Sequence, residues 1–316
     1  MTLTQLHYLV ALDEFRHFGR AAEACGVTQP TLSMQVQKLE DELGVALFDR
    51  LHQPIEPTEV GRQAVAQAKR TLSEARRFHQ VIEAGQSPFQ GSLSLGVIPT
   101  VAPYVLHRFL GSFIQKFTQL ELTVEERTTA ECIERIQEHR LDVALLATPL
   151  DERGLEILPL YQEPFVAYIP ENHRLSTELF ITRSELQQSD VLLLQEGHCF
   201  RQQTLSLCGA NGLKAGARVH VESGQFETLV RLSDAGLGIT LLPYLATLDL
   251  PSGQKTRIKP IAEPRPVRQI SLVFAEGSPK RKAIEALATQ IVDRLPEKLR
   301  TLDANSETMA PISKQE

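Results

Sequence analysis

The feature that most restricts the fold of this chain is a short turn near its N-terminus, Ala21-Ala22-Glu23-Ala24-Cys25-Gly26-Val27-Thr28-Gln29-Pro30. Small residues let two helices approach each other closely, and Gly26 adopts a left-handed turn conformation at little steric cost. Thr28 can accept hydrogen bonds from the first N–H groups of the second helix, and Pro30 is tolerated in its first turn. The turn therefore predicts a helix-turn-helix.

Apolar residues recur at helical spacing on both sides of this turn, which predicts amphipathic helices. The two stripes are Leu6, Leu9, Val10 and Leu12 before the turn and Leu32, Val36, Leu39 and Leu43 after it. The opposite face of the second helix carries side chains that suit base edges and phosphates, although any surface helix has a polar face. Beside such a turn, this face predicts DNA contacts by Gln29, Pro30, Thr31, Ser33, Met34, Gln37 and Lys38, together with Arg50.

The stretch after Arg50 is rich in proline and predicts a wing, and a long helix capped by Thr58 then runs to about residue 84, with Gly85 as its stop. A narrow apolar seam follows this helix for about 40 Å, through Ala64, Ala68, Leu72, Ala75, Phe78 and Ile82. Such a seam suits a partner helix and predicts a homodimer, the alternative being a helix that lies along its own body. We expect a winged DNA-binding domain at residues 1–58 and a linker and dimerisation segment at 59–90.

Strand and helix patterns alternate beyond residue 91, which predicts α/β structure with parallel sheets and crossover helices over residues 91–302. Expected strands are Leu93–Val97, Glu121–Glu125, Val143–Ala147, Phe165–Ile169, Val191–Leu194, Arg218–Val221, Ile239–Leu242 and Ile270–Phe274, and expected helices are Pro103–Phe117, Ala130–His139, Phe226–Ala235 and Pro279–Leu295. The large number of short strands favours two lobes over a single sheet. A ligand cleft is then expected at the carboxyl ends of the strands. The polar tail 303–316 is expected to be disordered.

Composition narrows the function classes. Residues 1–90 hold 9 Lys/Arg and 11 Asp/Glu, a net charge of −2, so DNA binding must depend on local geometry. The chain begins without a secretory signal and has no apolar stretch of membrane-spanning length, so we expect a cytoplasmic protein with no membrane partner. No metal-ligand spacing or Gly-rich nucleotide loop is found, so neither a metal nor a cofactor is expected, and a regulator is favoured over an enzyme.

Two of the four cysteines lie nine residues apart, and Cys199 follows an apolar strand at a predicted helix start. Helix N-terminal N–H groups, His198 and Arg201 would there favour the thiolate. In a continuous helix Cys199 and Cys208 would lie about 13–14 Å apart, whereas a disulfide needs Cα atoms within about 7 Å, so a bridge would require unwinding. The alternative is two unrelated cysteines. Cys25 and Cys132 are expected to be core residues.

Phe15-x-x-Phe18-x-x-Ala21-Ala22, Gln29-Pro30-Thr31-Leu32-Ser33 and Leu39-Glu40-x-x-Leu43-Gly44-x-x-Leu47-Phe48-x-Arg50 resemble the LysR-type transcriptional regulators. The resemblance implies a winged helix that binds double-stranded promoter DNA and a long linker helix that forms dimers, commonly assembled into tetramers. It further implies a two-lobed regulatory domain like the periplasmic binding proteins, and RNA polymerase as a partner. The wing departs from the family, because Gln53, Pro54 and Glu56 stand where basic residues are usual.

Gly197-His198-Cys199, Cys208 and Ile98-Pro99-Thr100-Val101-x-Pro103-Tyr104 resemble the peroxide-sensing members of that family. The resemblance implies a transcriptional activator of oxidative-stress genes in which Cys199 is peroxidatic and Cys208 resolving. It further implies hydrogen peroxide as effector, a thiol reductant of the glutaredoxin or thioredoxin type, and peroxide binding by Thr100, Thr129, His198 and Arg268, with Arg265 as second choice for the arginine. The alternative is a LysR-type regulator that responds to a small molecule in the cleft between the lobes.

Overall fold

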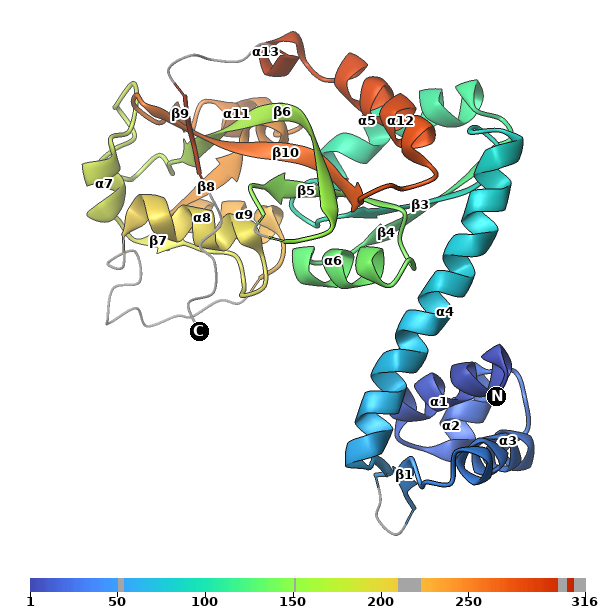
Figure 1. Cartoon of the computed structure of the whole chain (residues 1–316). Helices are drawn as coiled ribbons and strands as arrows, with labels where there is room; N and C mark the ends of the chain where they lie inside the picture. The colour runs from blue at the N-terminus through green and yellow to red at the C-terminus, as the bar shows by residue number, and fades with distance from the viewer. Residues whose placement is uncertain (51–53, 151, 210–222, 301–305, 310–316) are drawn as a thin grey trace. The chain divides into compact units, whose positions relative to one another are not determined.

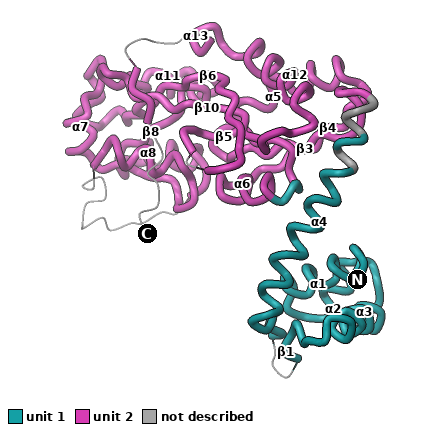
Figure 2. Tube along the Cα trace, in the orientation of Figure 1, with its two compact units in different colours: residues 1–82, 138–140 teal, residues 83–137, 141–316 magenta. Residues whose placement is uncertain are grey.

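A computed structural model describes residues 1–50, 54–150, 152–209, 223–300 and 306–309. These residues form two compact units, the first comprising residues 1–82 and 138–140 and the second the remainder (Figure 2). The strand expected at Arg218–Val221 lies outside the described residues. Within the described ranges, none of the helices has the length and apolar character needed to cross a membrane.

The first unit contains the predicted helix-turn-helix and wing. Its elements are α1 (Leu3–Phe15), α2 (Phe18–Ala24), α3 (Gln29–Leu43), β1 (Phe48–Asp49), β2 (Glu56–Pro57) and most of α4 (Glu59–Gln86), with β1 and β2 antiparallel. Leu32, Val36 and Leu39 are fully buried, as the helical stripe predicts. The capping prediction for Thr28 is wrong, because its hydroxyl bonds the Thr31 hydroxyl at 2.8 Å and makes no cap bond.

The long helix α4 begins as predicted, since the Thr58 hydroxyl accepts a hydrogen bond from the Gly61 N–H at 2.9 Å. Its seam divides into two parts. Ala68 is buried in the core of the first unit, whereas Phe78 is 66% and Ile82 53% exposed. The first part therefore lies along its own unit, as the alternative interpretation held, and the second part presents apolar side chains on the surface.

The second unit is built on a nine-stranded sheet with the order β4-β3-β5-β10-β6-β8-β7, with β11 beside β10 and β9 beside β6. The strands are β3 (Gly91–Val97), β4 (Leu120–Glu126), β5 (Val143–Thr148), β6 (Leu155–Tyr168), β7 (Val191–Leu192), β8 (Ile239–Pro243), β9 (Ile258–Pro260), β10 (Arg265–Ala275) and β11 (Ser306–Thr308). The helices are α5 (Ala102–Lys116), α6 (Thr129–Gln137), α7 (Arg183–Gln187), α8 (Cys199–Cys208), α9 (Phe226–Asp234), α10 (Tyr244–Leu248), α11 (Ser252–Lys255), α12 (Arg281–Asp293) and α13 (Glu297–Arg300).

The long strands β6 and β10 run side by side through the middle of this unit (Figure 1). One apolar core gathers around β3, β5, α5 and α12, and a second gathers around β8, α8 and α9, so the two predicted lobes are present. The prediction of parallel sheets is correct for only part of the sheet. β3 pairs with β4 and β5 in parallel, but β10 is antiparallel to β5 and β6, because β6 leaves the first lobe and β10 returns to it.

The tail is partly ordered, contrary to expectation. Ser306–Thr308 form β11, which pairs in parallel with Arg265–Val267 of β10. Met309 is buried in the second core, and its carbonyl accepts a hydrogen bond from Gln203 Nε2 of α8 at 2.8 Å. An apolar side chain and backbone pairing hold this segment, and neither is visible in its polar composition.

Candidate functional site around Cys199

The helix α8 carries a cysteine at each end. It begins at Cys199, as the sequence predicts, with His198 as its N-cap residue, and it is continuous over its ten residues. Both thiols are free and buried, Cys199 being 9% and Cys208 0% exposed. At the rise of an α-helix the two ends lie about 13–14 Å apart. The sulfurs cannot bond in this conformation.

The two cysteines belong to different cores. Cys199 packs in the core of the first lobe and Cys208 in that of the second. Between them, Phe200 fixes the helix by stacking on Phe165 and meeting Phe226 edge-on, each with ring centroids 4.8 Å apart. The helix α8 therefore spans the junction of the two lobes.

A buried arginine stands beside Cys199. Arg268, from β10, and Glu163, from β6, form an ion pair in which each side chain is only 1% exposed. Arg268 Nε and Nη2 donate to Glu163 Oε2 at 2.9 and 2.7 Å, and the guanidinium lies 5.2 Å from the centroid of the Phe200 ring. The second-choice arginine, Arg265, is exposed and pairs with Glu263 at 3.5 Å. Of the two candidate arginines, Arg268 is thus the buried one beside Cys199.

Thr100 completes the contacts of this guanidinium. Its hydroxyl accepts from Arg268 Nη1 and its carbonyl from Nη2, both at 3.1 Å. These bonds and the two to Glu163 use four of the five N–H groups of an arginine. Among the described residues, no protein acceptor meets the remaining N–H, which is on Nη1. In the described contacts, four of the five N–H groups of this arginine are thus used by Glu163 and Thr100.

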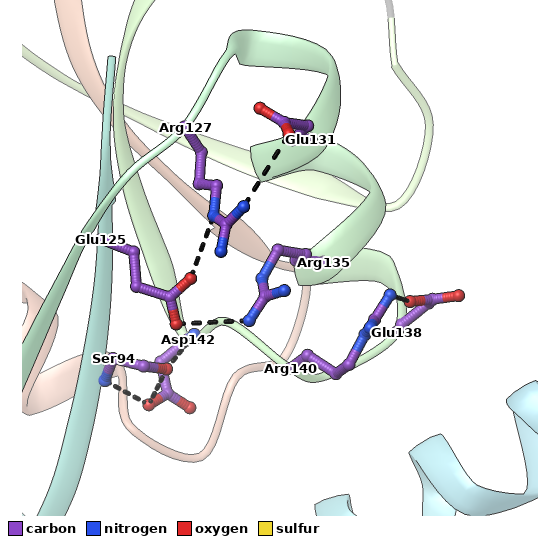
Figure 3. Close-up of polar contacts among 8 residues, drawn as sticks. All are labelled: Ser94, Glu125, Arg127, Glu131, Arg135, Glu138, Arg140 and Asp142. Carbon is purple, nitrogen blue, oxygen red and sulfur yellow. Dashed lines mark hydrogen bonds and ion pairs between the residues drawn. The ribbon is translucent and has the colours of Figure 1, made fainter. Parts of the chain in front are cut away.

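Thr129 is the first residue of α6. Ion pairs of Arg127 and Arg135 with Glu125 surround the start of this helix (Figure 3). The Thr128 N–H and hydroxyl both donate to Glu131 Oε2 at 2.8 Å, and Glu125 pairs with Arg127 and Arg135 at 3.2 Å. The Thr129 hydroxyl is buried and has no other partner among the described residues than the Cys199 thiol, which it contacts.

The electrostatics of Cys199 differ from the sequence-based expectation. Burial raises the pKa of its thiol above the ordinary value, and this effect exceeds the lowering by the Arg268 charge, the Thr129 contact and the helix-terminal N–H groups. Arg201 is not among the groups that lower it, and its Nη1 donates to the Leu194 carbonyl at 2.8 Å. The predicted lowering of this pKa is therefore wrong, since the local pattern shows the helix terminus but not the packing around it.

His198 and Cys208 are neutral for the same reason. Burial lowers the pKa of His198, so its imidazole is uncharged at neutral pH. Burial also raises the pKa of the Cys208 thiol to about 12. Cys132, expected in the core, is fully buried, with a pKa of about 12. All of these groups rest without charge.

The raised pKa of Cys199 predicts a pH-dependent reaction. Because pH 6 to 8 lies below that pKa, the thiolate fraction and the rate of Cys199 oxidation by peroxide should rise about tenfold per pH unit over this range. The measurement is stopped-flow kinetics on Cys208→Ser protein, in which the oxidised Cys199 cannot form a disulfide with residue 208. A rate that is flat across the range would contradict the assignment of a resting neutral thiol.

A cavity of about 930 Å³ opens next to His198, between the two lobes. Pro99 and Tyr104 line it from the first lobe, and Phe226 and Leu242 from the second. This is the cleft expected from the strand ends. No cluster of three metal-binding side chains occurs in the parts of the chain that the structure describes.

In the first unit, the predicted DNA-facing residues lie on the surface of α3. Gln29, Pro30, Met34, Gln37 and Lys38 are exposed, whereas Thr31 and Ser33 are half-buried. Arg50 is held within its own unit. Its Nη2 pairs with the buried Glu40 at 2.6 Å, and its guanidinium lies 5.4 Å from the Phe18 ring centroid.

Sequence reasoning missed Glu40 and Glu163. Glu40 Oε1 accepts from the N–H groups of Leu47 and Phe48 at 2.7 and 3.2 Å and so holds the start of the wing. The usable signal for both was a carboxylate within an apolar pattern, next to Leu39 in one case and inside a buried strand in the other. Such a residue is rarely buried unless it is paired.

Comparison with known families gives two matches. Residues 3–62 match the bacterial regulatory helix-turn-helix proteins of the lysR family, and residues 86–296 match the LysR substrate binding domain. Both matches agree with the units described above.

Among individual proteins, the chain is similar to the hydrogen peroxide-inducible genes activator of Haemophilus influenzae, with 35% identity over 93% of this chain and 97% of that protein. It is 36% identical to the DNA-binding transcriptional dual regulator OxyR of Escherichia coli K12, over 93% of this chain and 96% of that protein. It also resembles the structure of a full-length OxyR mutant from Pseudomonas aeruginosa, with a TM-score of 0.70, 35% identity and coverage of 92% and 98%. The chain also resembles the structure of a hydrogen peroxide-bound OxyR mutant from Corynebacterium glutamicum. The TM-score is 0.61 and the identity 29%, with coverage of 93% of this chain and 92% of that chain.

Proposed function

Since this chain belongs to the LysR family of bacterial regulators, we propose that it is a DNA-binding transcriptional regulator that senses hydrogen peroxide through a reversible Cys199–Cys208 disulfide. The observation that carries the proposal is one continuous helix with a buried thiol at each end, the first beside Arg268 and Thr129. The similarity to a hydrogen peroxide-inducible genes activator and to OxyR supports peroxide as the effector and oxidative-stress genes as the targets.

In the first step, the Cys199 thiolate attacks one peroxide oxygen. An S–O bond forms, the O–O bond breaks, and the departing hydroxide takes up a proton to leave as water, so that the sulfur becomes a sulfenic acid. Thr100, Thr129 and His198 offer hydroxyl and imidazole groups to a small neutral peroxide. The remaining N–H of Arg268 and its charge stabilise the departing hydroxide.

In the second step, the Cys208 thiolate attacks the sulfenic sulfur. The S–S bond forms, the S–O bond breaks, and a second water leaves. Because the helix holds the sulfurs apart, α8 must unwind, and Phe200 must leave its contacts with Phe165 and Phe226. A cytoplasmic dithiol of the thioredoxin or glutaredoxin type restores the thiols by exchange.

The unwinding of α8 changes the regulatory unit, and this change alters DNA binding through the contacts between copies of the chain. We expect a homodimer formed along the exposed part of the α4 seam, two of which make a tetramer on double-stranded promoter DNA. The exposed residues of α3 read the promoter, and the oxidised form activates transcription through RNA polymerase.

A second candidate function has one observation in its favour. The cavity beside His198, at about 930 Å³, has room for a molecule much larger than a peroxide, as in a regulator that responds to a metabolite. In that case the thiols would be incidental, and oxidation would leave DNA binding unchanged.

The deciding experiment treats the protein with one equivalent of peroxide and counts free thiols. The wild type should lose two thiols, Cys208→Ser should lose one, and Cys199→Ser should lose none on the same time scale. Cys132→Ser, which removes a buried thiol with a strongly raised pKa, is the matched control and should behave as the wild type. An intramolecular disulfide formed at the wild-type rate in Cys199→Ser would refute the assignment.

A further inference from the structure

We propose that Glu163 is a positioning residue for this thiol chemistry, which it serves by holding the Arg268 guanidinium in one orientation and by balancing its charge beside Cys199. The inference rests on the proposed function, because it concerns the same pocket. Glu163 itself contacts neither cysteine in the described contacts, so it acts through Arg268.

The Glu163 carboxylate is anchored from two sides. Its Oε1 accepts from the Leu245 N–H at 2.8 Å, and its Oε2 accepts from both Nε and Nη2 of Arg268 at 2.9 and 2.7 Å. Two bonds from one edge of a planar guanidinium fix the plane as well as the distance. Nη1, on the opposite edge, is thereby turned toward the Thr100 hydroxyl, and its remaining N–H stays available.

The charge of the pair has a second consequence. An isolated arginine cation beside a buried thiol would strongly stabilise the thiolate. Here Glu163 supplies the opposite charge to the same guanidinium, and both side chains are almost completely shielded from solvent. As a whole the pair is nearly neutral, and the Glu163 charge weakens the field of Arg268 at Cys199.

Two substitutions separate the two roles. Glu163→Gln keeps the side-chain length but removes the charge, and its single amide oxygen cannot serve both Leu245 and Arg268. Glu163→Asp keeps the charge but withdraws the carboxylate by one methylene. The matched control is Glu156→Gln, on the same strand, whose carboxylate pairs with Arg281 at the surface.

The experiment measures two rates for Cys199 from about pH 6 to about pH 10, oxidation by peroxide and alkylation by iodoacetamide, with mass spectrometry of the Cys199 peptide. In Glu163→Gln the midpoint of the alkylation profile should fall by about one pH unit, because Arg268 is left unbalanced. In Glu163→Asp the midpoint should stay in place. In both, the ratio of peroxide to alkylation rate should fall at least about tenfold, since a misplaced donor no longer meets the leaving oxygen.

Glu156→Gln should match the wild type in both rates. A merely structural role for Glu163 would lower thermal stability but leave the alkylation midpoint of the folded protein unchanged, and that result overturns the proposal. If Glu163→Gln does not fold, Glu163→Asp decides, and an unchanged rate ratio refutes the positioning role. Failure of wild-type Cys199 to react with peroxide would instead refute the proposed function, while the shift in the alkylation midpoint would still test the balance of charge.

Discussion

Replacing Arg268 by methionine should lower the free energy of unfolding by about 3–5 kcal/mol, because it leaves the Glu163 carboxylate buried without its partner. Both side chains are 1% exposed, so solvent cannot take over the lost contacts. Methionine fills a similar volume, and the loss therefore reports the unpaired charge rather than a cavity. Urea unfolding followed by circular dichroism measures the effect.

The control for this prediction is Arg281→Met, which removes a solvent-exposed guanidinium from its pairs with Glu156 and Glu285 and should change the free energy of unfolding far less. The double variant Arg268→Met/Glu163→Leu should recover most of the lost stability, since an apolar pair of similar size carries no desolvated charge. A loss below about 1 kcal/mol in Arg268→Met would show that Glu163 finds another partner or takes up a proton at little cost.

Oxidation should raise the rate of amide hydrogen exchange in Cys199–Cys208 at least about 100-fold, because the disulfide cannot form while α8 is intact. Unwinding exposes the buried side chains of Phe200 and Leu207, which costs about 1.5–3 kcal/mol for each. The measurement is exchange followed by mass spectrometry, on the reduced protein, the peroxide-treated protein and the same sample after reduction.

Cys208→Ser treated with peroxide is the control for this experiment. It reaches the sulfenic acid but cannot form the bridge, so the amides of α8 should keep their reduced-state protection. A wild-type disulfide formed with unchanged exchange across this helix would mean that the sulfurs meet without unwinding, and the proposed signal would lose its structural origin.

The parts of the fold that depend on neighbouring residues were predictable from sequence. The helix-turn-helix follows from Gly26 and from the buried stripe Leu32, Val36 and Leu39, and the helix start at Cys199 follows from its place after an apolar strand. The candidate arginine was identified by resemblance, and the structure distinguishes the buried Arg268 from the exposed Arg265.

What could not be predicted depends on residues far apart in the chain. Glu163 and Arg268 are separated by 105 positions, and only the pairing of β6 with β10 brings them together. The same pairing makes the sheet mixed. The sign of the pKa shift of Cys199 was wrong because the degree of burial is set by two lobes that close around it, which no local pattern records.

The hydrogen bond between Gln203 and the Met309 carbonyl links helix α8 to the segment that contains β11, and so stabilises the reduced conformation of the helix. Gln203 lies near the middle of α8, and β11 ties Met309 to β10 in turn. A chain cut before Ser306 would keep every reacting group yet lose a brace on the reduced conformation. We therefore expect loss of this segment to lower the peroxide concentration at which the regulator switches, with the reacting groups unchanged.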